Sequence, residues 1–123
     1  MTPKVLGIGG AMLLVATAAL HLSGYRAFAT QLEAAALPDF WRDAMKAVWV
    51  YFSLQLVIIA AAVAAQFAQR TPANRAVLVV CVALLAGNAL VLAWWLGAFI
   101  GTVAIAVATL TIGSATALQI RAA

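Results

Sequence analysis

The fold of this chain is decided by the stretch Ala76–Leu96, AVLVVCVALLAGNALVLAWWL, which contains no charged side chain. A helix needs about 20 consecutive apolar residues to cross the hydrocarbon core of a bilayer, and this stretch is of that length. Three further runs are similar in length and character: Val5–Leu22, Ala44–Ala65 and Ala98–Leu118. The sequence therefore predicts an all-α integral membrane protein, a four-helix bundle with antiparallel up-down-up-down topology.

The composition supports the same interpretation. Hydrophobic residues make up 67% of the chain and charged residues 8%, against roughly half and a quarter in soluble domains. The net charge of +4 comes from seven basic residues scattered along the chain, and such residues ordinarily flank membrane spans. We therefore expect membrane lipids as partners and no nucleic acid, and we leave open another membrane subunit or a homodimer partner.

We expect one transmembrane domain over residues 1–123. The first apolar run is longer than the 7–15-residue core of a typical secretory signal, so it is interpreted as a retained first helix. The predicted spans are about 5–24, 41–67, 76–96 and 98–119, with an outer amphipathic segment at about 26–38.

The distribution of charge predicts the orientation. The predicted end with both termini carries four basic residues, Lys4, Arg70, Arg75 and Arg121, and no acid, whereas the opposite end carries three, Arg26, Arg42 and Lys46, together with all three acids. Cytoplasmic loops are enriched in Lys and Arg. We therefore predict that both termini are cytoplasmic and that the protein is a multi-pass protein of the bacterial inner membrane. In the connection at this end, Pro72 and Asn74 should end one helix and start the next.

The long outer connection has two interpretations. Either the first helix projects above the membrane, or Ser23-Gly24 breaks it and a short helix lies along the surface. After this segment, Asp39 is expected to be the N-cap of the second span, and the pairs Asp39–Arg42 and Asp43–Lys46 have the spacing of ion pairs on one helix face. We also predict that segment 27–41 folds as a lid over the uncharged turn at 94–101.

A stripe of small residues predicts how the fourth span packs. Small residues allow the close approach that drives helix association in lipid. They recur along this span at steps of four and three residues: Gly97, Gly101, Ala104, Ala108, Thr111 and Ala115. The stripe fits packing inside one bundle, and a homodimer interface is the alternative.

Polar residues at membrane depth mark the candidate site, because they are costly there. Counting residues along the predicted spans places several polar and aromatic side chains in the outer half, where they would form a ligand-binding cavity with apolar walls. The candidate ligand-binding residues are His21, Tyr25, Trp49, Ser53, Asn88, Trp94 and Trp95. Each also has a structural interpretation: His21 as a backbone or water partner, Asn88 as a bridge between helices, and the tryptophans as an interfacial belt.

Several chemistries lack the residues that they need. No Asp, Glu, Lys or Arg lies well inside a span, whereas ion-coupled carriers usually keep a carboxylate there. One His and one Cys, Cys81, cannot complete a metal coordination shell, and no second His is present for a bis-His haem. We therefore assign no catalytic residue and no metal, and leave the cofactor unknown.

A pattern of His21, an acidic and aromatic loop, and then Trp49-Val50-Tyr51-Phe52-Ser53 resembles the small, largely uncharacterised four-span membrane proteins of bacteria. The resemblance implies no activity. The chain lacks the first-span carboxylate of small multidrug-resistance transporters and the Asn- and Phe-rich pore signature of dual-topology fluoride channels.

Three functions remain. The first is a non-catalytic protein that binds a lipid or quinone-like apolar ligand in the outer-leaflet cavity, or serves as an accessory subunit of a membrane complex. The second is a small homodimeric transporter or channel, and the third is an intramembrane enzyme that uses His21.

Overall fold

The computed structural model describes residues 2–69 and 73–121, and all regular structure within these residues is helical. The helices are, in chain order, α1 (Pro3–Ser23), α2 (Tyr25–Ala34), α3 (Asp39–Ala68), α4 (Arg75–Leu96) and α5 (Ile100–Arg121). Four stretches are long and apolar enough to cross a membrane: α1 together with α2, then α3, α4 and α5. The chain is therefore an integral membrane protein with four spans.

Local residues explain where these helices begin and end. The Thr2 side chain caps α1 by accepting a hydrogen bond from the amide of Val5, and Pro3 occupies the first turn, where its missing N–H is not needed. Asn74 caps α4 as predicted, whereas Arg70 and Pro72 lie outside the described residues. The predicted N-cap Asp39 is wrong, because Pro38 holds that position and Asp39 is the first helical residue.

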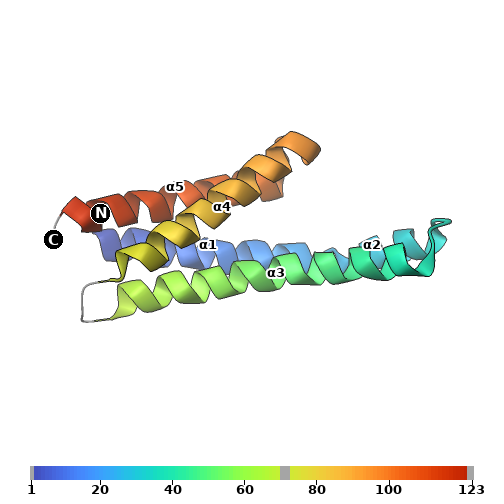
Figure 1. Cartoon of the computed structure of the whole chain (residues 1–123), viewed down its shortest axis with the longest axis horizontal. Coiled ribbons are helices and arrows are strands. Elements are labelled where there is room, and N and C mark those ends of the chain that lie inside the picture. The colour runs from blue at the N-terminus through green and yellow to red at the C-terminus, as the bar shows by residue number, and fades with distance from the viewer. Residues whose placement is uncertain (1, 70–72, 122–123) are drawn as a thin grey trace.

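Gly97 ends α4 with a φ of 75°, a backbone conformation that residues other than glycine rarely adopt. The chain reverses there and enters α5 at Ile100. Figure 1 shows the result: the start of α1, the end of α5, the end of α3 and the start of α4 lie at one end of the bundle. The opposite end, which holds α2 and the α4–α5 turn, is called the far end below.

The hydrophobic core of the bundle lies along α1, because α1 packs closely against both α3 and α5. The fully buried side chains of this core come from all four spans: Leu14, Leu56, Val63, Leu78, Leu85, Ile105 and Ile112. Ala108 and Ala115 of the small-residue stripe are fully buried as well. These two alanines therefore pack inside the bundle, as the first interpretation of the stripe predicts.

The first helix projects beyond the far end of the bundle instead of breaking at Ser23-Gly24. Gly24 keeps a right-handed helical conformation, and the amide of Phe28 donates to its carbonyl, so α2 continues α1. With α2 included, the stretch Pro3–Ala34 is 32 residues long, whereas α4 and α5 have 22 each. At 1.5 Å per residue it reaches roughly 15 Å further, and Figure 1 shows α2 extending past the α4–α5 turn.

This arrangement makes the predicted lid wrong. α2 packs against α3 and α1, and it rises past the α4–α5 turn rather than crossing over it (Figure 1). α2 is held along α3 by the stacked rings of Phe28 and Trp49 and by ion pairs between the two helices. Glu33 on α2 accepts from Lys46 and also lies 3.5 Å from the guanidinium of Arg42. Arg42 pairs with Asp39 as predicted, whereas Lys46 pairs with Glu33 rather than with Asp43.

Replacing Glu33 with glutamine should loosen α2, because both ion pairs to α3 lose their acid. Exposed ion pairs contribute little each, so we expect the amides of α2 to exchange with deuterium about 2- to 5-fold faster. Hydrogen–deuterium exchange by mass spectrometry measures this. Asp43→Asn is the matched control, since Asp43 forms no ion pair among the described residues, and equal effects of the two changes would contradict this role of Glu33.

The four spans do not close evenly around the core. α1 packs along both α3 and α5, and α5 packs on α4, but the contact between α3 and α4 is much smaller. Figure 1 shows the cause: α4 starts beside α3 and diverges from it toward the far end. The two helices therefore leave space between them in the far half of the bundle.

Candidate ligand-binding cavity

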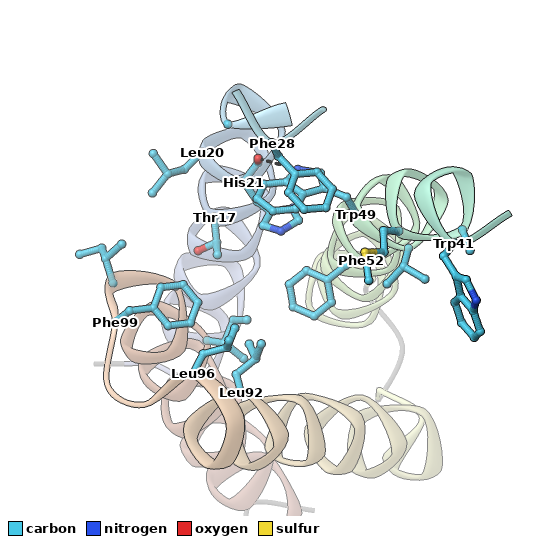
Figure 2. A pocket seen from close by; sticks show the side chains of 17 residues that line it. Thr17, Leu20, His21, Phe28, Trp41, Trp49, Phe52, Leu92, Leu96 and Phe99 are labelled. Carbon is cyan, nitrogen blue, oxygen red and sulfur yellow. Dashed lines mark hydrogen bonds between the residues drawn. The ribbon is translucent and has the colours of Figure 1, made fainter. Parts of the chain in front are cut away.

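A half-open cavity of about 700 Å³ occupies the space that the divergence of α3 and α4 creates. Small-molecule sites are commonly about 300–1,000 Å³, so its size suits a small ligand. The cavity is lined from all five helices and the α4–α5 turn (Figure 2). The lining residues are Thr17, Leu20, His21, Gly24, Phe28, Trp41, Ala44, Met45, Val48, Trp49, Phe52, Leu92, Leu96, Phe99, Ile100, Gly101 and Ile105.

Three stacked rings form one side of this cavity. The Trp49 indole lies between the His21 imidazole, at a centroid distance of 4.1 Å, and the Phe28 ring, at 4.2 Å. Phe52 meets the imidazole edge-on at 5.2 Å. Gly24 lies next to the stack, where an added Cβ would make an ordinary van der Waals contact, 3.4 Å, with the Trp49 ring. The stack connects α1, α2 and α3.

Hydrogen bonds fix the imidazole at the cavity wall. The Nδ1 atom of His21 lies 2.8 Å from the Oγ atom of Ser53, and the indole N–H of Trp49 donates to the His21 carbonyl at 3.1 Å. Ser53 is only 1% exposed and does not line the cavity. Its hydroxyl therefore lies behind the imidazole, and a ligand in the cavity meets the histidine but not the serine.

The rest of the wall is apolar. No Asp, Glu, Lys or Arg is among the lining residues. The hydroxyl of Thr17 is already used, since it donates to the Leu13 carbonyl at 2.8 Å. The Trp41 side chain lies apart from the stack at one edge (Figure 2). Such a site favours an uncharged ligand, because a charge placed there would lose its hydration without gaining a partner.

Four of the seven predicted site residues lie elsewhere. Tyr25 is on α2 and is half-buried, and Asn88 is half-buried on α4. Trp94 and Trp95 are 84% and 77% exposed beside the α4–α5 turn, which is where an interfacial belt would place them. None of the four lines the cavity. The Nδ2 atom of Asn88 is buried without a hydrogen-bond partner among the described residues.

The other three predicted residues come together with neighbours that sequence reasoning did not assign to the site. Phe28 and Phe52 complete the ring cluster. Their spacing was an available signal, because Phe28 follows His21 by seven residues and Phe52 follows Trp49 by three, so each pair shares a helix face. The wall from Leu92 and Leu96 had no such signal in a span that is apolar on every side.

The pairing of a serine with a histidine does not form a nucleophile site here. In such a site the serine oxygen must face the substrate and a third group orients the histidine. Ser53 is buried behind the ring, and the bond uses Nδ1. The arrangement can hold an imidazole in place and present its remaining nitrogen to a ligand.

No protein-family model, no curated protein and no solved structure matches this chain.

Proposed function

We propose that this protein is a non-catalytic binder of an apolar small molecule, a lipid or a quinone-like compound, which it takes up from the membrane into the cavity between α3 and α4. The single observation that supports this function is the cavity itself. It is about 700 Å³ in volume and half-open, its wall is apolar apart from a few groups, and it lies in the part of the bundle where α3 and α4 separate. Apolar walls with few polar groups are typical of small-molecule sites.

The proposal retains three of the predicted site residues. His21 and Trp49 contact the ligand from the wall, and Ser53 holds His21 from behind. The ligand enters sideways from the lipid between α3 and α4. An ion-coupled transporter has less support, because no charged side chain lines the cavity, and an enzyme has less support because Ser53 is inaccessible to a ligand.

We also propose that both termini are cytoplasmic in a bacterial inner membrane, so that the cavity lies in the outer leaflet. The charge pattern supports this orientation. Four of the seven basic residues, Lys4, Arg70, Arg75 and Arg121, belong to the end with the termini, against Arg26, Arg42 and Lys46 at the far end.

A tryptophan at position 92 should fill the cavity and prevent binding. Two probes with the same alkyl tail are suitable, decylubiquinone and decylbenzene, titrated into the protein in detergent by isothermal titration calorimetry with empty micelles as a blank. We expect Leu92→Trp to weaken binding of either probe by at least about tenfold, because the indole would occupy ligand space.

Leu90→Trp is the matched control, because Leu90 is on the same helix, is 72% exposed and is not a lining residue. It should bind both probes like the wild type. Absence of saturable binding of both probes, or equal affinity in Leu92→Trp and the wild type, would contradict the proposed function.

A further inference from the structure

The chemical identity of the ligand depends on which nitrogen of His21 carries the hydrogen, and Ser53 decides this. Four threonines in the spans donate their hydroxyl hydrogen to the carbonyl four residues back, at 2.7–2.8 Å: Thr17, Thr109, Thr111 and Thr116. Ser53 makes no such bond among the described residues. The Nδ1 atom of His21, at 2.8 Å, is the partner of its hydroxyl.

A buried hydroxyl must place its hydrogen on an acceptor, because an unmade buried hydrogen bond is costly. If Nδ1 carried the hydrogen and donated to Ser53, the serine hydrogen would have no acceptor among the described residues. The serine therefore donates to Nδ1, and the hydrogen of the neutral imidazole is on Nε2. This assignment follows from the hydrogen-bond geometry.

The Nε2–H group is the polar feature that the stack offers to a ligand. One face of the ring is covered by Trp49 and its edge meets Phe52, so only the remaining edge is available. Nε2 has no hydrogen-bond partner among the described residues, and His21 lines the cavity (Figure 2). The site thus offers one donor within an uncharged, aromatic wall, which suits an uncharged ligand with a carbonyl oxygen.

We propose that Ser53 holds His21 as the Nε2–H tautomer so that it donates a hydrogen bond to the carbonyl oxygen of a quinone bound in the cavity. This inference rests on the proposed function and specifies its ligand class. A quinone combines the required features: it is neutral, its flat ring suits a wall that contains Phe52 and Phe99, and its carbonyl accepts from Nε2. Its apolar tail would leave between α3 and α4 toward the lipid.

The tautomer can be observed directly, because His21 is the only histidine in the chain. A two-bond ¹⁵N–¹H correlation NMR spectrum of the ¹⁵N-labelled protein will contain a single imidazole pattern. We expect a protonated Nε2 and an unprotonated Nδ1 in the wild type, and a mixture of tautomers in Ser53→Ala. A protonated Nδ1 in the wild type would overturn the inference.

The ligand class is tested with the two probes used above, since decylbenzene has a flat six-membered ring and the same decyl tail but no oxygen atom to accept a hydrogen bond. We expect the wild type to bind decylubiquinone about tenfold tighter than decylbenzene, the effect of one well-placed hydrogen bond. His21→Phe keeps a stacking ring but removes the donor. It should lose that preference by weakening decylubiquinone alone, and Ser53→Ala should reduce the preference several-fold.

Palmitate, which carries a negatively charged head, should bind more weakly than decylubiquinone. Equal affinity for decylubiquinone and decylbenzene in the wild type would overturn the quinone assignment while leaving the proposed function standing. An equal loss for both probes in His21→Phe would overturn it too, since His21 would then act only on the shape of the cavity. No binding of either probe would overturn the proposed function and this inference together.

Discussion

Replacing Gly10 with leucine should force α1 away from α5 and lower the free energy of unfolding by about 1–3 kcal/mol or more, the usual effect of overpacking a filled core. A Cβ on Gly10 would lie 2.5 Å from the Cγ1 atom and 3.2 Å from the Cδ1 atom of Ile112. Ile112 is fully buried in the core, so moving it aside would displace its core neighbours. The carbonyl oxygen of Ala108, 3.6 Å away, closes the site from the backbone side.

Gly9 provides the matched control, because a Cβ there meets nothing within 4 Å. Gly9→Leu gains the same helix propensity as Gly10→Leu, up to about 1 kcal/mol, without a clash. Unfolding in mixed micelles with increasing dodecyl sulfate, followed by circular dichroism, measures both variants. If Gly10→Leu proved as stable as Gly9→Leu, the close contact of α1 with α5 would be refuted.

Replacing Trp49 with leucine should have a second large effect, a loss of about 2–4 kcal/mol. The change removes two stacked ring pairs, with His21 and with Phe28, each worth about 0.5–1.5 kcal/mol beyond burial. It also removes the hydrogen bond to the His21 carbonyl, worth about 1 kcal/mol. Because the stack joins α2 to α3, amide exchange in Tyr25–Ala34 should become faster as well.

Trp94→Leu is the control for the general effect of losing a tryptophan. Trp94 is 84% exposed, and surface substitutions usually change stability by no more than about 0.5 kcal/mol. The same dodecyl sulfate titration compares the two variants. A loss in Trp94→Leu as large as that in Trp49→Leu would show that the stack is not what stabilises the far end.

Both predictions concern contacts that also shape the cavity. The α1–α5 contact anchors α5, on which α4 packs, and the ring stack forms part of the cavity wall. The exposed acids and bases between α2 and α3 have a smaller energetic role because water screens them. They add to the ring stack in keeping α2 alongside α3.

Local features of the sequence were sufficient for some structural details. The cap at Asn74 and the pair Asp39–Arg42 each depend on residues within one turn of helix, so their chemistry is readable from spacing alone. The partner of Lys46 was not predictable in this way. Glu33 lies on another helix, and only the docking of α2 on α3 brings the two side chains together.

The height of each candidate residue along its span could be predicted, but the direction in which its side chain points could not. Counting residues along a span gives height, because a helix rises 1.5 Å per residue, and this placed His21, Trp49 and Ser53 at one level. It placed Asn88, Trp94 and Trp95 in the same half of the bundle. Which of them face the cavity depends on the rotation of each helix about its axis, and α4 carries apolar residues on every side.

The amino-acid sequence by itself therefore determined that this chain has four membrane-length helices, since apolar length and helix caps are local properties. Only the tertiary structure decided that α4 diverges from α3, that a cavity forms between them, and that His21 lies on its wall. The physical reason is that lipid and protein core are equally apolar to these helices. Burial of apolar surface therefore does not decide which face of a helix points inward. Close contacts such as that of Gly10 with Ile112 set the packing instead.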